Sequence, residues 1–298
     1  MNYFVYNLYG INVRLPFQLY LLDSVSSKKI DIDFISNNNI SIPKSFPRVR
    51  PYYDASLNKV RIHYPNVLYC EILNNGKEIN FKFLKNGKSN ISLIQSRLIN
   101  HILPYALYQR REIVLHASGI IDNKEAILFI GKSGFGKSSL SASFKSNKFI
   151  SEDAIMIKKS KKEYIAYPST PYLKLDPKIV ENLELSYSKK LHLKDDRLDR
   201  SMYKLSNFFQ IPSPVKACYI LNWGEDFQIS DLSVKEVIGE LLISSFTAHP
   251  INSCEISAAD FNNFIFNFYN DIRFFKLTRS KSNLFNDNDK IIKHFQSI

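Results

Sequence analysis

The chain has 298 residues, of which 45% are hydrophobic and 23% charged, so it can form a large core and is not a disordered protein. Its net charge of +12 favours anionic ligands, but no Lys/Arg-rich block is present, and we expect no specific nucleic-acid partner. Three scattered cysteines, the lack of a signal-peptide pattern and the lack of an apolar run near ~18 residues predict a cytoplasmic protein without disulfides, zinc or membrane contact.

Short strands between polar turns are predicted throughout the first part of the chain. The strands are Tyr3–Leu8, Lys59–His63 and Ile79–Leu84. The turns contain Asn75-Gly76 and Asn86-Gly87, pairs that tolerate positive φ. We predict a β-rich N-terminal domain over residues 1–88 and a second domain over residues 89–298.

The hydrophobic period changes at residue 91 to that of a helix, which should end near Leu103 because Pro104 disfavours helical geometry in the residue before it. Strands are then predicted at 113–116 and 126–130, around a turn at Asp122-Asn123, and at 148–151. Residues 181–206 are charged and poorly patterned, which predicts a loop-rich segment. Capping patterns at Ser233 and Ser257 predict two late helices.

A phosphate-binding loop is the most specific motif of the chain. Residues 131–138, GKSGFGKS, match G-x-x-x-x-G-K-[ST] after an apolar strand and before a helical run. The glycines let backbone N–H groups face phosphate oxygens, Lys137 reaches the β- and γ-phosphates, and the Ser138 hydroxyl binds Mg²⁺. The predicted nucleotide contacts are Gly131, Lys132, Ser133, Gly134, Phe135, Gly136, Lys137, Ser138 and Ser139.

An acidic pair and a histidine are the candidate catalytic groups. Glu152-Asp153 follows the apolar end of a strand, where carboxylates can hold Mg²⁺ or orient an acceptor hydroxyl, although an exposed acidic turn fits the sequence equally well. His116 ends the strand before the loop strand, a position that suits either a structural or a catalytic side chain.

Residues 115–157, with a histidine after a strand, a hairpin, the phosphate loop, a short helix and an acidic pair, resemble the catalytic core of the HPr kinase/phosphorylase family. The similarity is greatest to divergent members, including kinases found with lasso-peptide biosynthesis. The stretches YGINVRLPF and AYPSTPYLKLDP, at residues 9–17 and 166–177, resemble segments of the same members.

The resemblance implies an α/β (α+β) fold, in which a phosphoenolpyruvate-carboxykinase-like P-loop kinase core follows the β-rich N-terminal domain. It also implies that Glu152 accepts the proton of a substrate serine, that Asp153 acts on the metal together with Ser138, and that His116 is an active-site residue. Lys137 completes the implied catalytic set.

The sequence also departs from the family. Glu152 stands where the family usually has aspartate, and residues 166–177 contain no match to its second metal-binding glutamate. The downstream arginine signature has only three stand-ins, Arg197, Arg200 and Lys204. HPr itself is therefore not the expected substrate, and the phosphorylase reaction is not expected.

We predict an ATP- and Mg²⁺-dependent kinase that transfers the γ-phosphate to a hydroxyl, with serine of a peptide or protein, such as a natural-product precursor, as the leading acceptor. One alternative is a kinase for a small molecule or glycan intermediate. Another is a nucleotide-binding regulatory module without catalysis. The sequence leaves the acceptor and the division of roles between Glu152 and Asp153 open, and it is compatible with a homo-oligomer.

Overall fold

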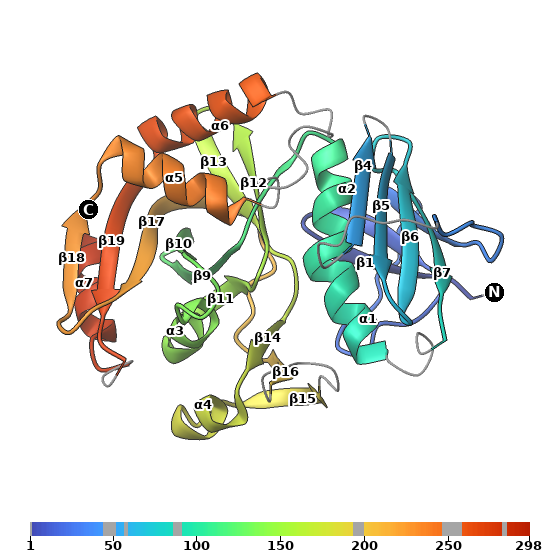
Figure 1. Ribbon diagram of the computed structural model, residues 1–298. Helices are drawn as coiled ribbons and strands as arrows, with labels where there is room; N and C mark the ends of the chain where they lie inside the picture. The colour runs from blue at the N-terminus through green and yellow to red at the C-terminus, as the bar shows by residue number, and fades with distance from the viewer. Residues whose placement is uncertain are drawn as a thin grey trace.

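The computed structural model describes residues 2–43, 52–56, 59–85, 91–192, 200–245, 258–281 and 285–298. Over these residues the chain is a mixed α/β protein with three sheets (Figure 1). None of the helices in these ranges is long and apolar enough to cross a membrane. The predictions for Asn86-Gly87, the cap at Ser257 and Arg197 lie outside the described residues.

The first seven strands form a sheet of their own, in the order β1-β2-β3-β7-β6-β5-β4. Its strands are β1 Phe4–Leu8, β2 Ile11–Leu15, β3 Ile32–Ser36, β4 Tyr52–Ser56, β5 Lys59–Tyr64, β6 Leu68–Leu73 and β7 Glu78–Phe83. The three strands predicted in this region are confirmed to within one residue at each end. Alternating residues such as Val60 and Ile62 are fully buried, as one face of a sheet packed on a core requires.

A helical column lies between this sheet and the rest of the molecule (Figure 1). It consists of α1 Ile91–Arg97, the π-helical turn η1 Leu98–Ile102 and α2 Leu103–Gln109. The prediction that the helix ends near Leu103 is therefore wrong. The π-turn explains the continuation, because Pro104 falls in the first turn of α2, where a missing N–H costs little.

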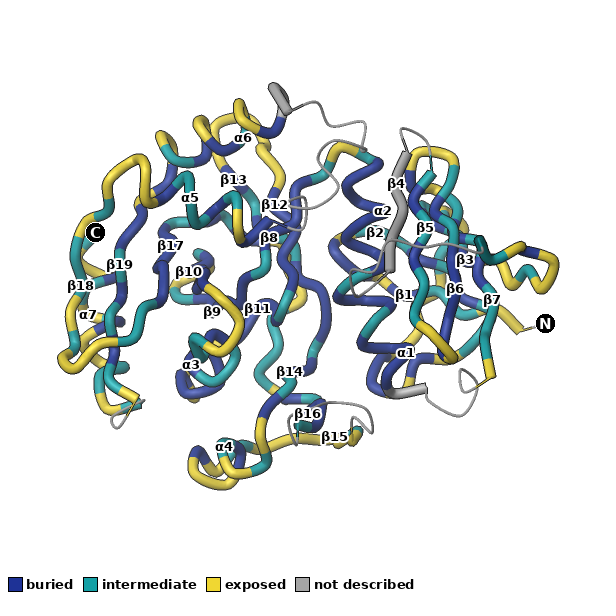
Figure 2. Tube along the Cα trace, viewed as in Figure 1, coloured by how far each residue is buried: buried dark blue, intermediate teal, exposed yellow. Residues whose placement is uncertain are grey.

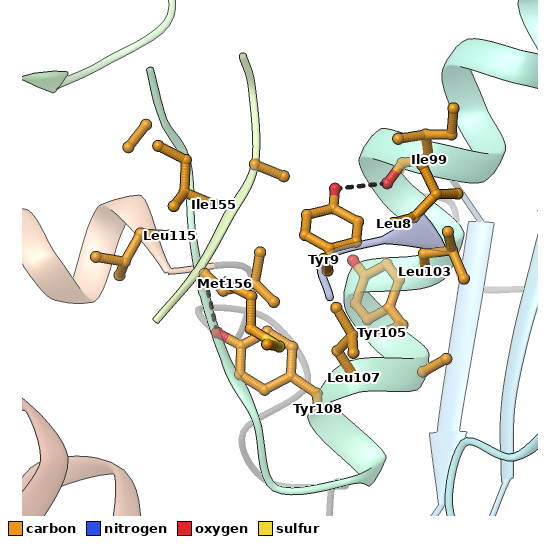
Figure 3. Close-up of a cluster of buried hydrophobic side chains, with 14 of the residues drawn as sticks. Leu8, Tyr9, Ile99, Leu103, Tyr105, Leu107, Tyr108, Leu115, Ile155 and Met156 are labelled. Atoms are coloured by element: carbon orange, nitrogen blue, oxygen red, sulfur yellow. Dashed lines mark hydrogen bonds between the residues drawn. The ribbon is translucent and has the colours of Figure 1, made fainter. Parts of the chain in front are cut away.

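The π-turn leaves one backbone carbonyl open for a contact from elsewhere in the chain. The N–H of Leu103 donates to the carbonyl of Leu98, and Pro104 has no N–H to offer the carbonyl of Ile99. The Tyr9 hydroxyl donates to that carbonyl at 2.9 Å (Figure 3). Tyr9 also donates its backbone N–H to the carbonyl of Pro168 at 2.9 Å, so it joins the N-terminal sheet, the helical column and the later chain.

The large central sheet has the order β11-β9-β10-β17-β13-β12-β8, and β19 joins β17 and β18. Its strands are β8 Ile113–Leu115, β9 Ala117–Asp122, β10 Glu125–Ile130, β11 Lys148–Ser151, β12 Ile155–Ser160, β13 Glu163–Tyr167, β17 Ser213–Trp223, β18 Gln228–Asp231 and β19 Arg273–Arg279. The strand predicted at 148–151 is confirmed. The hairpin prediction needs a correction, because β9 rather than β8 pairs with β10, while β8 pairs with β12.

Helices cover both faces of the central sheet. The helices α5 Val234–Ser244 and α6 Ala258–Asp271 share a core with Leu128 and Ile130 of β10. The helices α3 Lys137–Ser143 and α7 Asn288–Ser297 share a second core with Phe129 of the same strand. Ser233 caps α5 with the predicted capping box. Successive side chains of β10 point to opposite faces of the sheet and enter these two cores in turn. The loop that follows β10 therefore begins between the two helical layers.

A small third sheet corrects the prediction of a loop over residues 181–206. It has the order β14-β16-β15, with β14 Tyr172–Leu175, β15 Tyr187–His192 and β16 Ser201–Leu205, and α4 Pro177–Asn182 lies between β14 and β15 in the chain. The strand β15 is almost wholly exposed (Figure 2), so no alternating hydrophobic pattern marks it in the sequence. Residues 193–199 of the predicted loop lie outside the described residues.

We expect Tyr9→Phe to lower the free energy of unfolding by about 1–3 kcal/mol, because it leaves the buried Ile99 carbonyl without a donor. Urea denaturation measures the change. Tyr3→Phe is the matched control, since Tyr3 is 54% exposed, and it should leave stability unchanged. Equal stability of the two variants would show that the bond from Tyr9 to Ile99 does not stabilise the contact between the N-terminal sheet and the helical column.

Candidate active site

Sheet topology brings the predicted site residues to one edge. The strand β9 runs antiparallel to both β10 and β11, with Ile130 opposite Ala117 and Ser151 opposite Gly119. The ends of β10 and β11 and the start of β9 therefore lie at the same edge of the sheet. Gly131, Glu152 and His116, the residues next to these strand ends, are brought together although they are far apart in the sequence.

The phosphate loop has the backbone that its glycines permit. Gly134 and Gly136 have φ of 87° and 75°, which side chains rarely adopt. A Cβ at Gly134 would meet nothing within 4 Å, whereas one at Gly136 would lie 3.2 Å from Arg279 and 3.3 Å from Trp223. The loop is thus open to solvent at Gly134, whereas at Gly136 it packs against the side chains of Arg279 and Trp223.

Lys137 points back into the loop. Its ammonium donates to the carbonyl of Gly131 at 2.7 Å and to that of Lys132 at 3.2 Å. Burial lowers the pKa of Lys137 to about 8, although the nearby Asp153 and Glu152 carboxylates oppose the shift. A buried cation that faces the middle of the loop favours an anionic ligand there.

Glu152 lies against the loop at the start of α3. It is 2% exposed and accepts hydrogen bonds from the Ser138 hydroxyl and from the backbone N–H of Lys174, each at 2.9 Å. Burial, and then the charge of Asp153, raise the pKa of Glu152 to about 8. Of the two acidic residues, Glu152 is therefore the one in contact with the predicted Mg²⁺ ligand Ser138.

Asp153 faces a different set of partners. Its carboxylate accepts from the ammonium of Lys174 and from the side-chain amide of Asn100, the latter at 3.3 Å. Burial opposes ionisation, but the charge of Lys174 outweighs it and holds the pKa of Asp153 below its usual range. Asp153 is therefore ionised in a largely buried pair with Lys174.

Two half-buried histidines flank this pair. Burial lowers the pKa of His116 to about 4, against the opposing influence of Asp153, and lowers that of His101 to about 3. Both imidazoles are therefore neutral at pH 7. His116 is held between β8 and β9 by its backbone N–H, which donates to the carbonyl of Ser244 at 2.6 Å.

The structure thus gathers Lys137, Ser138, Glu152, Asp153 and His116 around one edge. Lys132, Ser133 and Gly134 lie exposed along the loop, Phe135 stacks on Trp223, and Ser139 is half-buried at the start of α3.

Three residues of this cluster were not predicted from the sequence: Asn100, His101 and Lys174. A charged residue between the leucines of YLKL was a signal for Lys174, but nothing in the sequence tied it to the acidic pair. Of the possible stand-ins for the family's arginines, Lys204 instead pairs with Asp23 at 2.7 Å.

The residues at this edge fit a magnesium–nucleotide complex. A serine hydroxyl and carboxylate oxygens are the hard ligands that Mg²⁺ prefers, and they complete its coordination with phosphate oxygens and water. Lys137 would supply the positive charge for the phosphates. Ser138 would bind the metal and Asp153 would act on it, with Glu152 hydrogen-bonded to Ser138 beside them.

Comparisons with known proteins give little beyond a distant likeness. No protein-family model matches the chain, and no curated protein matches it in sequence. Among solved structures, it is similar to the HPr(Ser) kinase/phosphatase from Coxiella burnetii, with 10% identity and a TM-score of 0.32, over 61% of this chain and 95% of that one. These values describe a distant structural relationship and are too low to assign an activity.

We expect Lys174→Met to destabilise the protein by about 2–4 kcal/mol, because it leaves the largely buried Asp153 carboxylate without a counter-charge. Adding Asp153→Asn should recover part of the loss. Lys204→Met is the matched control, since its partner Asp23 is 81% exposed, and should cost at most about 1 kcal/mol. Thermal and urea unfolding measure all four proteins, and a Lys174→Met variant as stable as Lys204→Met would contradict a buried pair.

Proposed function

We propose that the chain is an ATP- and Mg²⁺-dependent phosphotransferase that transfers the γ-phosphate to an alcohol, with serine of a peptide or protein as the leading acceptor. The observation that carries the proposal is the 2.9 Å bond between Ser138 of the phosphate loop and the buried carboxylate of Glu152. A metal-binding hydroxyl and a carboxylate with a raised pKa then share one position, where the terminal phosphate and its acceptor would meet.

Each residue has a proposed part in the transfer. The loop backbone and Lys137 hold the phosphates, and Lys137 stabilises the charge of the transferred group. Mg²⁺ held by the Ser138 hydroxyl beside Asp153 would neutralise negative charge on the phosphates. Glu152 orients the acceptor hydroxyl and accepts its proton, a role that suits a carboxyl whose pKa is raised by burial.

Asp153 and His116 have supporting parts in the proposal. The ionised Asp153 adds negative charge beside the metal, and its pairing with Lys174 fixes its direction. Neutral His116 lies close enough to Asp153 for the charge and the backbone of Asp153 to affect the pKa of the imidazole, so it can position the acidic pair without adding charge of its own.

Lys137→Ala should lose at least about a hundredfold in phosphate transfer, because Lys137 is the cation that the loop directs at the transferred group. The assay is transfer from radiolabelled ATP to a panel of serine peptides and hydroxylated metabolites. Lys145→Ala, which removes a 53% exposed lysine just beyond α3, is the control and should be fully active. Nucleotide binding without any turnover by the wild-type chain would instead identify a regulatory module.

Glu152→Gln should bind Mg·ATP like the wild type but transfer phosphate at least about tenfold more slowly, because the loop is intact and the proton acceptor is lost. Asp153→Asn should mainly raise the Mg²⁺ concentration needed for half-maximal rate. Single-turnover transfer at saturating Mg·ATP, repeated over a Mg²⁺ series, separates the two effects. If Glu152→Gln keeps its rate while Asp153→Asn is inactive, the two roles are reversed.

A further inference from the structure

The position of the acidic pair sets the direction of a nucleotide in the phosphate loop. Glu152 follows β11, which is separated from β10 by β9 alone, and it contacts Ser138. In the proposed function the γ-phosphate and Mg²⁺ lie on this side of β10. The α-phosphate and the nucleoside must then extend to the other side, over the ends of β17 and β19 (Figure 1).

A cavity is present on that side of the loop. It has a volume of about 180 Å³ and lies between the loop, the end of β17 and the start of α5. Ile220, Leu221 and Leu232 give it apolar walls. The side-chain amide of Asn222 and the carboxylates of Glu236 and Glu240 add polar groups that can bond base nitrogens and ribose hydroxyls.

Phe135 joins this cavity to the phosphate loop. It lines the cavity, and its ring stacks on that of Trp223 with 6.1 Å between centroids and 25° between planes. The guanidinium of Arg279 donates to the Phe135 carbonyl at 2.9 Å and lies 5.1 Å from the centre of the Trp223 ring. The aromatic wall is therefore held in place from behind, as a stacking surface for a base requires.

Arg279 is an independent sign of an anion on this side. It is 2% exposed, its Nε has no hydrogen-bond partner, and no carboxylate pairs with it among the described residues. Burial lowers the pKa of Arg279 to about 10, so the charge remains. A buried cation without a counter-charge is unfavourable, and the phosphate chain beside the loop would supply that counter-charge.

We propose that this cavity binds the nucleoside end of the triphosphate, with the base packed on Phe135 and the ribose directed at the α5 carboxylates. The inference rests on the proposed function, since it takes the direction of the nucleotide from the position of Glu152. It assigns to Arg279 and Trp223 the positioning of Phe135, and it makes the cavity the part of the protein that selects a nucleotide over a bare polyphosphate.

Filling the cavity tests the inference. Leu232→Trp should weaken binding of Mg·AMP-PNP at least about tenfold and leave binding of Mg·tripolyphosphate unchanged, because only the nucleotide carries a base to be stacked. Val234→Trp is the matched control: Val234 is 44% exposed in the first turn of α5, does not line the cavity, and should change neither affinity. Calorimetric titration gives the affinities, and thermal melting checks the fold of each variant.

The wild-type chain provides a second measurement that needs no variant. Irradiation with 8-azido-ATP should label residues of the loop around Phe135, the end of β17 or the start of α5, and AMP-PNP should prevent the labelling. Protected labelling elsewhere, or an equal loss of both ligands in Leu232→Trp, would overturn the cavity as the nucleoside site. If the wild type binds neither AMP-PNP nor tripolyphosphate, the proposed function fails, and this inference fails with it.

Discussion

The hydrogen bond from Tyr9 to the carbonyl of Ile99 is the contact on which the arrangement of the molecule depends. The π-turn and Pro104 together leave that carbonyl open, and a buried open carbonyl is costly. Tyr9, in the turn between β1 and β2, donates to this carbonyl (Figure 3). Its backbone N–H bonds Pro168 after β13, so Tyr9 links the helical column to the N-terminal and central sheets. The same turn carries Asn100 to the Asp153 carboxylate, so the stability of the interface and the geometry of the site have one origin.

Charge balance explains why the two acidic residues differ. Two lysines and two carboxylates meet at one sheet edge, Lys137 and Glu152 buried and Lys174 and Asp153 partly exposed, and their pairing is unequal. Asp153 takes the ammonium of Lys174, while Glu152 receives only neutral donors from Ser138 and the Lys174 backbone. Glu152 is consequently the group whose ionisation is unfavourable without an added cation, and Mg²⁺ that arrives with a nucleotide would relieve that cost.

The sequence was sufficient to predict local features that carry their own chemistry. The loop at 131–138, the strands at 126–130 and 148–151 and the cap at Ser233 each have a motif or period that short-range physics explains. Long-range pairing could not be predicted in this way. β9 was missed because Ala117-Ser-Gly has no strand pattern, and Asn100 and Lys174 reach Asp153 only through the packing of three separate elements.

The backbone conformation of Asp153 sets the geometry of the acidic pair. In an extended strand, consecutive side chains point to opposite faces, so adjacent carboxylates would normally diverge. Asp153 instead has a φ of 64°, which costs an L-residue roughly 1 kcal/mol or more and turns the chain sharply after Glu152. Lys174 binds both carboxylates that this turn places side by side. Its backbone N–H donates to Glu152, and its ammonium pairs with Asp153. The extra methylene of Glu152 lets its carboxylate bond this N–H and still reach Ser138, so the longer side chain is matched to the strained turn that follows it.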